Sequence, residues 1–177
     1  DMIVGNVSTA SALAAMEVAE QFKRVSIVNG AASLQITNEK CTPYSIHYVY
    51  DTYALSRGTG KAVVDSGKKT WFFVTADYAF GHTLERDTTE VVLASGGKVL
   101  GGVKHPINTT DFSSFMAQAQ SSKAEVIGLA NAGGDTIGSV KQAAELGIMG
   151  SKQTVVPLLM FTSDIQALGL RPVSYTH

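Results

Sequence analysis

The stretch WFFVTADYAFGHTLERDTTEVVLASGG, residues 71–97, joins a strand to a helix and decides the fold class. It begins with apolar and aromatic residues, as a buried strand does. After Gly81, apolar residues recur at helical spacing until a double glycine at 96 and 97 ends the pattern. This unit predicts an α/β fold, in which the strand-to-helix turn lies at the edge of the sheet where such folds bind ligands.

The same alternation of strand and helix continues along the chain. Strand-like runs stand at 3–4, 25–28, 98–103, 125–129 and 155–161, and helical patterns at 8–22, 51–66, 112–120 and 135–146. A loop is expected between 29 and 43. Repeated βα units with short connections predict open, mostly parallel sheets flanked by helices.

Composition excludes several classes of protein. The 177 residues are 45% hydrophobic, enough for the core of one ordinary domain or two small ones. The formal net charge is −1, and basic residues form no run longer than a pair such as Lys68 and Lys69, so no nucleic-acid partner is expected. No apolar run approaches the ~20 residues of a membrane span. The single cysteine, Cys41, excludes an internal disulfide and a cysteine-built zinc site.

The alternation of strands and helices is interrupted once, at KCTPYSIHYVYDTYA, residues 40–54, where we place a domain boundary. The chain opens inside a strand-like run, with no pattern of a signal peptide. Its last residues, RPVSYTH at 171–177, continue no pattern. We therefore expect a piece of a longer protein.

Small or polar residues follow four of the expected strands. The turns are GNVST at 5–9, NGAAS at 29–33, TADYAFG at 75–81 and LANAGGD at 129–135. Small residues let a ligand approach backbone N–H groups, and helix N-termini favour carboxylate or phosphate. Within the last turn, Asn131 offers no evident benefit to the end of a strand, so we interpret it as functional. Together the turns predict a polar cleft.

Other candidate residues keep two interpretations. Ser8 and Thr9 would bind a ligand carboxylate or cap the helix that follows them. Tyr78 and Phe80 would stack on a ligand or pack at the edge of the sheet. Asp135 would hold a ligand ammonium or serve as a helix cap.

Signatures of catalysis are missing. The segment RGTGKA, residues 57–62, lacks the first glycine and the final Ser or Thr of a phosphate loop. No nucleophile elbow of the form G-x-S-x-G occurs, and the four histidines show no metal-ligand spacing. His82 and Glu85 stand one helical turn apart, which favours a solvated pair over an acid-base dyad. We expect no catalytic residues, no metal and no cofactor.

Several segments carry a resemblance to a known family. They are VNGAASLQIT at 28–37, CTPYSIHYVYDTYAL at 41–55, TADYAFGHTLERDTTEVVLASGGKVLG at 75–101, HPINTTDFSSFMAQAQSSKAEVIGLANAGGD at 105–135 and KQAAELGI at 141–148. The chain resembles the type I extracytoplasmic solute-binding proteins of ABC transporters, in the branched-chain amino-acid (Leu/Ile/Val-binding) group. The likeness extends from residue 1 to about 170. Its motifs, D-Y-x-x-G, P-x-x-x-x-D-F-x-S and K-Q-A-x-E-x-G-I, occur together and in order.

The resemblance implies a binding protein whose two α/β lobes close on a small ligand without any reaction. The first lobe would take the amino-acid carboxylate and ammonium at Ser8, Thr9, Gly30, Ala31, Ala32 and Ser33. The second lobe would contribute Asp77, Tyr78, Phe80, Asn131, Asp135 and Asp164. In this family an acidic residue near Asp164 often meets the ligand ammonium.

The chain also departs from the family pattern. Leucine binders tend to carry tyrosines where this chain has NAGGD, residues 131–135, which predicts a roomier and more polar pocket. Aromatic acids, amides and urea-like compounds are thus candidates beside amino acids. We expect residues 1–42 to form part of a first lobe whose opening strand precedes Asp1, and residues 43–177 to form most of the second lobe. A first lobe without its central strand would leave apolar surface uncovered.

The functional hypothesis is a periplasmic protein that delivers an amino acid, or a related carboxylate or aromatic acid, to the membrane permease of an ABC transporter. It would need no cofactor. The alternative is a ligand-sensing regulatory domain of the same fold. A small α/β enzyme is a third hypothesis, but it needs a nucleophile or metal cluster that the sequence does not present.

Overall fold

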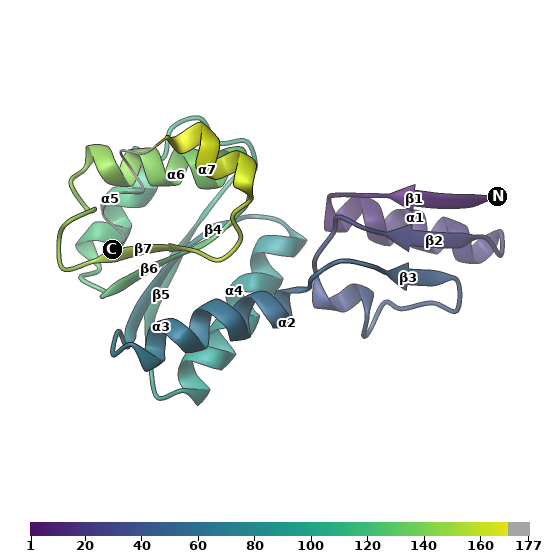
Figure 1. Ribbon diagram of the computed structural model, residues 1–177, viewed down its shortest axis with the longest axis horizontal. Coiled ribbons are helices and arrows are strands. Elements are labelled where there is room, and N and C mark those ends of the chain that lie inside the picture. The colour runs from purple at the N-terminus through teal and green to yellow at the C-terminus, as the bar shows by residue number, and fades with distance from the viewer. Residues whose placement is uncertain (170–177) are drawn as a thin grey trace.

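Two parallel sheets organise the described residues, 1–169, of the computed structural model (Figure 1). The first sheet has the order β1-β2-β3, with β1 at Met2–Gly5, β2 at Val25–Val28 and β3 at Ser45–His47. Both neighbouring pairs are parallel. The sheet lies at the right of Figure 1, and its strands run toward the rest of the molecule.

The two faces of the first sheet are covered differently. Helix α1, Thr9–Gln21, packs on the face that carries Val28, where its Ala12 and Met16 are buried. The opposite face carries apolar side chains that remain exposed. These are Met2 (62% exposed), Val4 (57%), Val25 (37%) and Ile46 (48%). A parallel sheet is normally covered on both faces, and the predicted uncovered apolar surface on this lobe is confirmed.

A helical segment of three parts leads from the first sheet to the second. Helix α2 covers Thr52–Leu55, a π-helical turn (η2) covers Ser56–Gly60, and helix α3 covers Lys61–Asp65. The segment matches the helix predicted over 51–66. Asp51 caps its first turn, since its Oδ1 accepts a hydrogen bond of 2.8 Å from the backbone N–H of Ala54.

The second sheet has the order β5-β4-β6-β7. Its strands are β4 at Thr70–Ala76, β5 at Lys98–His105, β6 at Val126–Ala130 and β7 at Thr154–Pro157. All neighbouring pairs are parallel. The apolar stretches that predicted β4 and β6 make the interior of this sheet, and every residue of β6 is buried.

Helices cover both faces of the second sheet (Figure 1). Helix α4, Ala79–Ala94, packs with α2 and α3 on the face that buries Trp71 and Phe73. On the other face lie α5 at Ser113–Ser121, α6 at Gly134–Glu145 and α7 at Thr162–Leu168. The predicted fold class, open parallel sheets flanked by helices, is confirmed.

The structure adds short elements that the sequence did not predict. Strand β3 lies inside the expected boundary loop, a 3-10 turn (η1) covers Leu34–Ile36, and α7 follows the last strand. Strand β7 ends at Pro157, earlier than predicted. Because β3 pairs with β2, the first sheet extends past residue 42, and the division into lobes at 42/43 stays a prediction. The predicted end of the second lobe at residue 177 and the tail after Leu170 lie outside the described residues.

Within residues 1–169, no helix has the length and apolar character that crossing a membrane requires.

Candidate functional site

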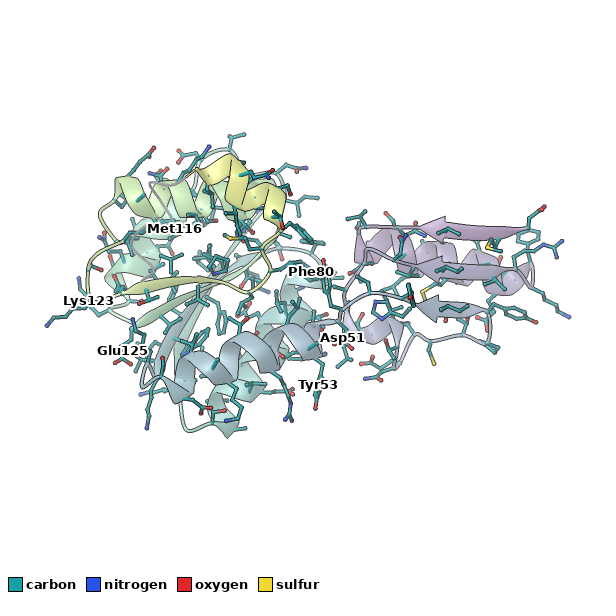
Figure 2. All side chains as sticks on the ribbon, in the orientation of Figure 1. Asp51, Tyr53, Phe80, Met116, Lys123 and Glu125 are labelled. Atoms are coloured by element: carbon teal, nitrogen blue, oxygen red, sulfur yellow. The ribbon has the colours of Figure 1, made fainter. Side chains whose placement is uncertain are left out.

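We call the first sheet with α1 and η1 the first lobe, and the second sheet with its helices the second lobe. The carboxyl ends of both sheets lie at the junction between them (Figure 1). The strands of the first sheet point toward the second lobe (Figure 1). Phe80, which follows β4, and Asp51, which precedes α2, lie toward the junction, whereas Lys123 and Glu125, which precede β6, lie at the far end (Figure 2). The turns that carry the candidate residues are therefore gathered in one region.

Two turns of the first lobe lie against each other. The backbone N–H of Ala31 donates to the carbonyl of Asn6 at 2.9 Å. A β-carbon at Gly30 would stand only 3.0 Å from Cα of Val7. Glycine thus permits this close approach, and the structure brings the turn with Ser8 to the turn with Gly30.

Ser8 and Thr9 begin helix α1. Ser8 is exposed at the N-cap position, and its side chain makes no hydrogen bond to the helix. The first N–H groups of a helix have no partner within it. Thr9 is 1% exposed, and its hydroxyl has no hydrogen-bond partner among the described residues. A buried hydroxyl without a partner is unfavourable, but this one is closed off from the surface. The donors that this turn presents to a carboxylate are the exposed Ser8 hydroxyl and the first N–H groups of α1.

Ala32 and Ser33 contact the second lobe. The hydroxyl of Ser33 is buried and donates to Thr83 Oγ1 on α4 at 3.2 Å. The carbonyl of Ala32 accepts from the N–H of Thr52 at 2.8 Å, and its methyl group belongs to the core cluster that contains Phe80. In this structure these residues join the lobes.

Tyr78 and Phe80 form a ring pair at the edge of the second sheet. Their centroids are 5.9 Å apart, with a tilt of 44°. Phe80 is buried, and Tyr78 packs partly exposed against the same core. Burial, and after it the charge of Asp135, raises the pKa of Tyr78 to about 12. Its phenol is therefore neutral at physiological pH.

Each of the three candidate acids has a partner within the second lobe. Asp135 Oδ2 accepts from the backbone N–H of Asn108 at 3.2 Å, and Asp164 Oδ2 from that of Phe161 at 2.9 Å. Both acids are buried. Asp77 is exposed, and its Oδ1 lies 2.7 Å from Nε2 of His82. The structure thus pairs His82 with Asp77, and not with Glu85 as the sequence spacing predicted.

Asn131 has a structural role that the sequence interpretation missed. Its side chain is fully buried, and its Oδ1 accepts from the hydroxyl of Thr136 at 2.9 Å. Its Nδ2 lies 3.1 Å from Ser139 Oγ and 3.1 Å from His105 Nε2. The interpretation that a strand end gains nothing from this asparagine is wrong, because it ties β6 to β5 and α6. Contact with a ligand stays a prediction.

Two aromatic residues at the same edge were missed as site residues. Tyr50 and Phe161 form a pair with centroids 6.4 Å apart, and Phe161 is 40% exposed. Burial, and after it the charge of Asp164, raises the pKa of Tyr50. The aromatic-rich break in the chain around Tyr50 was the signal available in the sequence.

Two surface grooves occur among the described residues. One of about 490 Å³ separates α1 from residues 39–42 and includes Met16 and Cys41. Another of about 330 Å³ runs beside α4 and includes His82 and Lys104. None of the candidate residues lines either groove. No group of three or more His, Cys, Asp or Glu within residues 1–169 is arranged to hold a metal ion.

Comparison with known proteins gives concordant results. The chain is 56% identical to a periplasmic binding protein from Burkholderia mallei, with a TM-score of 0.93 over 97% of this chain and 45% of that one. It is 29% identical to a solute binding protein of an ABC transporter from Rhodopseudomonas palustris BisB5, solved with 3,4-dihydroxybenzoic acid (TM-score 0.80; 88% and 42% covered). A curated relative, Leu/Ile/Val-binding protein homolog 6 of Brucella melitensis biotype 1, is 28% identical over 94% of this chain and 43% of its own length.

The chain thus spans less than half the length of these relatives. The sequence profile of the family described as "Periplasmic binding protein" matches residues 1–176. The parallel sheets and the helices on both faces of the second sheet are consistent with this match. The chain belongs to the periplasmic binding protein family.

Proposed function

We propose that this chain forms ligand-binding surface of a periplasmic solute-binding protein, which delivers an amino acid or a related carboxylate to the permease of an ABC transporter. One observation carries the proposal: the carboxyl ends of both sheets meet at the junction, with the exposed N-cap residue Ser8 of α1 on one lobe and the Tyr78–Phe80 ring pair on the other. The names of the relatives support it, one referring to Leu/Ile/Val and another to a bound aromatic acid.

Binding would combine two kinds of contact. The first turn of α1 would take the ligand carboxylate through backbone N–H groups and the hydroxyl of Ser8. The aromatic residues of the second lobe would contact the rest of the ligand. Closure of the lobes would follow from contacts that the ligand makes only in the closed state. No covalent step is involved.

Thermal unfolding of the full-length protein across a library of amino acids, aromatic acids and amides tests this function. At ~100-fold excess over the dissociation constant, one-site binding stabilises the folded state by about 2.7 kcal/mol. We expect at least one carboxylate to do so and to be recovered unchanged after incubation. The proposal is wrong if no carboxylate raises the unfolding temperature, or if the protein converts its ligand into a product.

A further inference from the structure

A buried histidine connects two turns of the second lobe. His105 is the last residue of β5, and its side chain is fully buried. Strand β4 lies between β5 and β6 in the sheet, so the imidazole reaches past the end of β4 to meet Asn131, which follows β6. The rings of Phe112 and Phe115 pack edge-on against it, with centroids 4.8 and 5.9 Å away. Both ring nitrogens must therefore find their hydrogen-bond partners within the protein.

One ring nitrogen of His105 has to donate. Its Nδ1 lies 2.8 Å from the backbone carbonyl oxygen of Pro106. A carbonyl oxygen has no proton to offer, so Nδ1 carries the proton of this hydrogen bond. The contact ties the imidazole to the first residue of the loop that follows β5.

The other ring nitrogen has to accept. The hydroxyl of Ser139 donates to the carbonyl of Asp135 at 2.7 Å, so it can only accept from Asn131 Nδ2, at 3.1 Å. On the other side of the same amide, Oδ1 accepts from the hydroxyl of Thr136 at 2.9 Å. These contacts fix the orientation of the amide, which places Nδ2 3.1 Å from Nε2 of His105. Because an amide nitrogen only donates, Nε2 has no proton, and the network requires the Nδ1–H tautomer.

The loop after β5 and the turn after β6 also meet at their backbones. The N–H of Asn108 donates to Oδ2 of Asp135 at 3.2 Å. Asn108 has a φ of 59°, in the left-handed region that side chains other than glycine seldom adopt. Such a residue persists where its surroundings hold the loop in shape. The contact of His105 with Pro106 holds the start of the loop, and its contact with Asn131 holds the start of the turn.

We propose that His105 is a positioning residue of the candidate site. As the Nδ1–H tautomer, its imidazole keeps the loop at 106–109 and the turn at 131–135 in the arrangement that presents Asp135. The inference rests on the proposed function, in which this turn meets the solute, and it concerns how the site is held. His105 does not touch the solute, since it is fully buried; its effect passes through Asn131.

Three substitutions separate the two hydrogen bonds of His105 from the volume of its ring. His105→Gln puts an amide oxygen near the position of Nε2 and retains an acceptor for Asn131. His105→Asn puts an amide nitrogen near the position of Nδ1 and retains a donor for Pro106. His105→Phe retains a ring of similar size and neither hydrogen bond.

Amide hydrogen exchange of the full-length protein measures how firmly the turn is held. His105→Phe should raise the exchange rates of the Asn108 N–H and of residues 131–136 by roughly 10-fold. At residues 131–136, His105→Asn should resemble His105→Phe, whereas His105→Gln should stay within about 3-fold of the parent.

The order of the variants decides the inference. A ring that only fills space predicts the reverse order, with His105→Phe closest to the parent, and this result or unchanged exchange in all three variants overturns it. The matched control is His47→Gln, since both ring nitrogens of His47 are also hydrogen-bonded but lie in the first lobe. It should leave the exchange of residues 131–136 unchanged.

The tautomer can be tested without relying on a variant that folds. Nitrogen-15 NMR of the imidazole rings in the full-length protein distinguishes a protonated from an unprotonated ring nitrogen. His105 should show a protonated Nδ1 and an unprotonated Nε2. A protonated Nε2 would contradict the network and overturn the inference.

Binding measurements separate the inference from the function beneath it. The probes are L-leucine and benzoate, one from each proposed class of solute. For a probe that the parent binds, calorimetry should show His105→Phe binding roughly 10-fold more weakly and His105→Gln within about 3-fold. Equal affinities of parent and both variants would refute the inference and leave the function standing. If the parent binds neither probe, the proposed function fails for both compounds, while the exchange rates and the tautomer still decide the inference.

Discussion

The hydroxyl of Thr52 donates a 2.6 Å hydrogen bond to Oδ2 of Asp87, and both residues are buried. The same hydroxyl accepts from the N–H of Leu34 at 3.1 Å. The other carboxylate oxygen of Asp87 accepts two hydrogen bonds from Arg86, at 2.8 and 3.0 Å. Leu34 lies in η1, between β2 and β3 of the first sheet, and Asp87 lies on α4, so a single threonine connects a loop of one lobe with a helix of the other.

Replacing Thr52 should weaken this connection. Thr52→Val preserves shape but leaves a buried carboxylate oxygen and the Leu34 N–H without their partner, which costs ~1–3 kcal/mol. Urea denaturation of the full-length protein measures the free energy of unfolding. The matched control is Thr110→Val at an exposed position, expected within about 0.5 kcal/mol of the parent. Equal losses in the two variants would show that the connection contributes nothing.

Gly81 allows helix α4 to approach the second sheet. A β-carbon there would lie 2.1 Å from the carbonyl oxygen of Ala76 and 3.1 Å from that of Ala130. Gly81→Ala should therefore destabilise the fold by ~1–3 kcal/mol or more. At Gly58, in the π-helical turn, a β-carbon meets nothing within 4 Å, so Gly58→Ala should stabilise by roughly 0.5–1 kcal/mol. Thermal unfolding should shift in opposite directions for the two variants; a shift in the same direction contradicts this account.

Replacing Asn131 should lower the stability of the folded protein. Asn131→Ala removes its contacts with Thr136 and Ser139 and should lower the free energy of unfolding by about 2 kcal/mol. Asn38→Ala, at an exposed position, serves as control and should have little effect. A loss of ligand affinity at unchanged stability in the Asn131 variant would instead support the functional interpretation of this residue.

Removing the hydroxyl of Thr9 should raise the stability of the ligand-free protein and lower its affinity for the ligand. Because the buried hydroxyl has no partner among the described residues, Thr9→Val should stabilise the ligand-free protein by up to about 1 kcal/mol. If the hydroxyl serves the ligand carboxylate, the same variant should bind roughly 10-fold more weakly. Calorimetry and thermal unfolding of one protein sample measure both, and Ser11→Ala at an exposed site of the same helix is the control. Unchanged affinity would remove Thr9 from the site.

Glu125 should make stability depend on acid pH. Its Oε2 accepts from the backbone N–H groups of Lys69 and Thr70, and these hydrogen bonds hold the pKa of the carboxyl below its usual value of 4.5. A lowered pKa in the folded state stabilises the protein above about pH 4.5, and this contribution is lost as the pH falls through the folded value.

Glu125→Ala should thus destabilise the protein most near neutral pH, and the difference from the parent should shrink below pH 4.5. Urea denaturation at a series of pH values measures it. Glu20→Ala removes an exposed carboxylate that makes no hydrogen bond among residues 1–169 and should have a smaller effect. A difference that grows toward acid pH would contradict the sign of the expected change.

Periodicity predicted the long elements because each carries its own signal. The apolar run before Thr75 and the glycines that end α4 need no knowledge of distant residues. Strand β3 was missed because its three residues contain one apolar side chain, and pairing with β2 makes it a strand. Because parallel strands all end at one edge of a sheet, the sequence also predicted that the turns lie at a common edge.

Hydrogen-bond partners could not be predicted in the same way. Ser33 reaches Thr83, fifty positions away in the chain, and Asn131 meets His105. A side chain looks available in a sequence until its partner is known, which is why Asn131 was interpreted as functional. Of the two aromatic pairs at the edge of the second sheet, the sequence predicted only Tyr78 and Phe80, which share a turn. Tyr50 and Phe161 are far apart in the sequence and meet only in the fold.

The π-helical turn at Ser56–Gly60 sets which side of the α2–α3 segment faces the second sheet. Thr52, Ser56, Gly60 and Val64 are all buried at intervals of four, and over twelve residues an uninterrupted α-helix would rotate the last of them by about 120° relative to the first. The wider turn absorbs that rotation. Deleting a residue from it would turn α3 by about 100° and expose Val64, so in an alignment of related chains this helix should tolerate substitutions but no gaps.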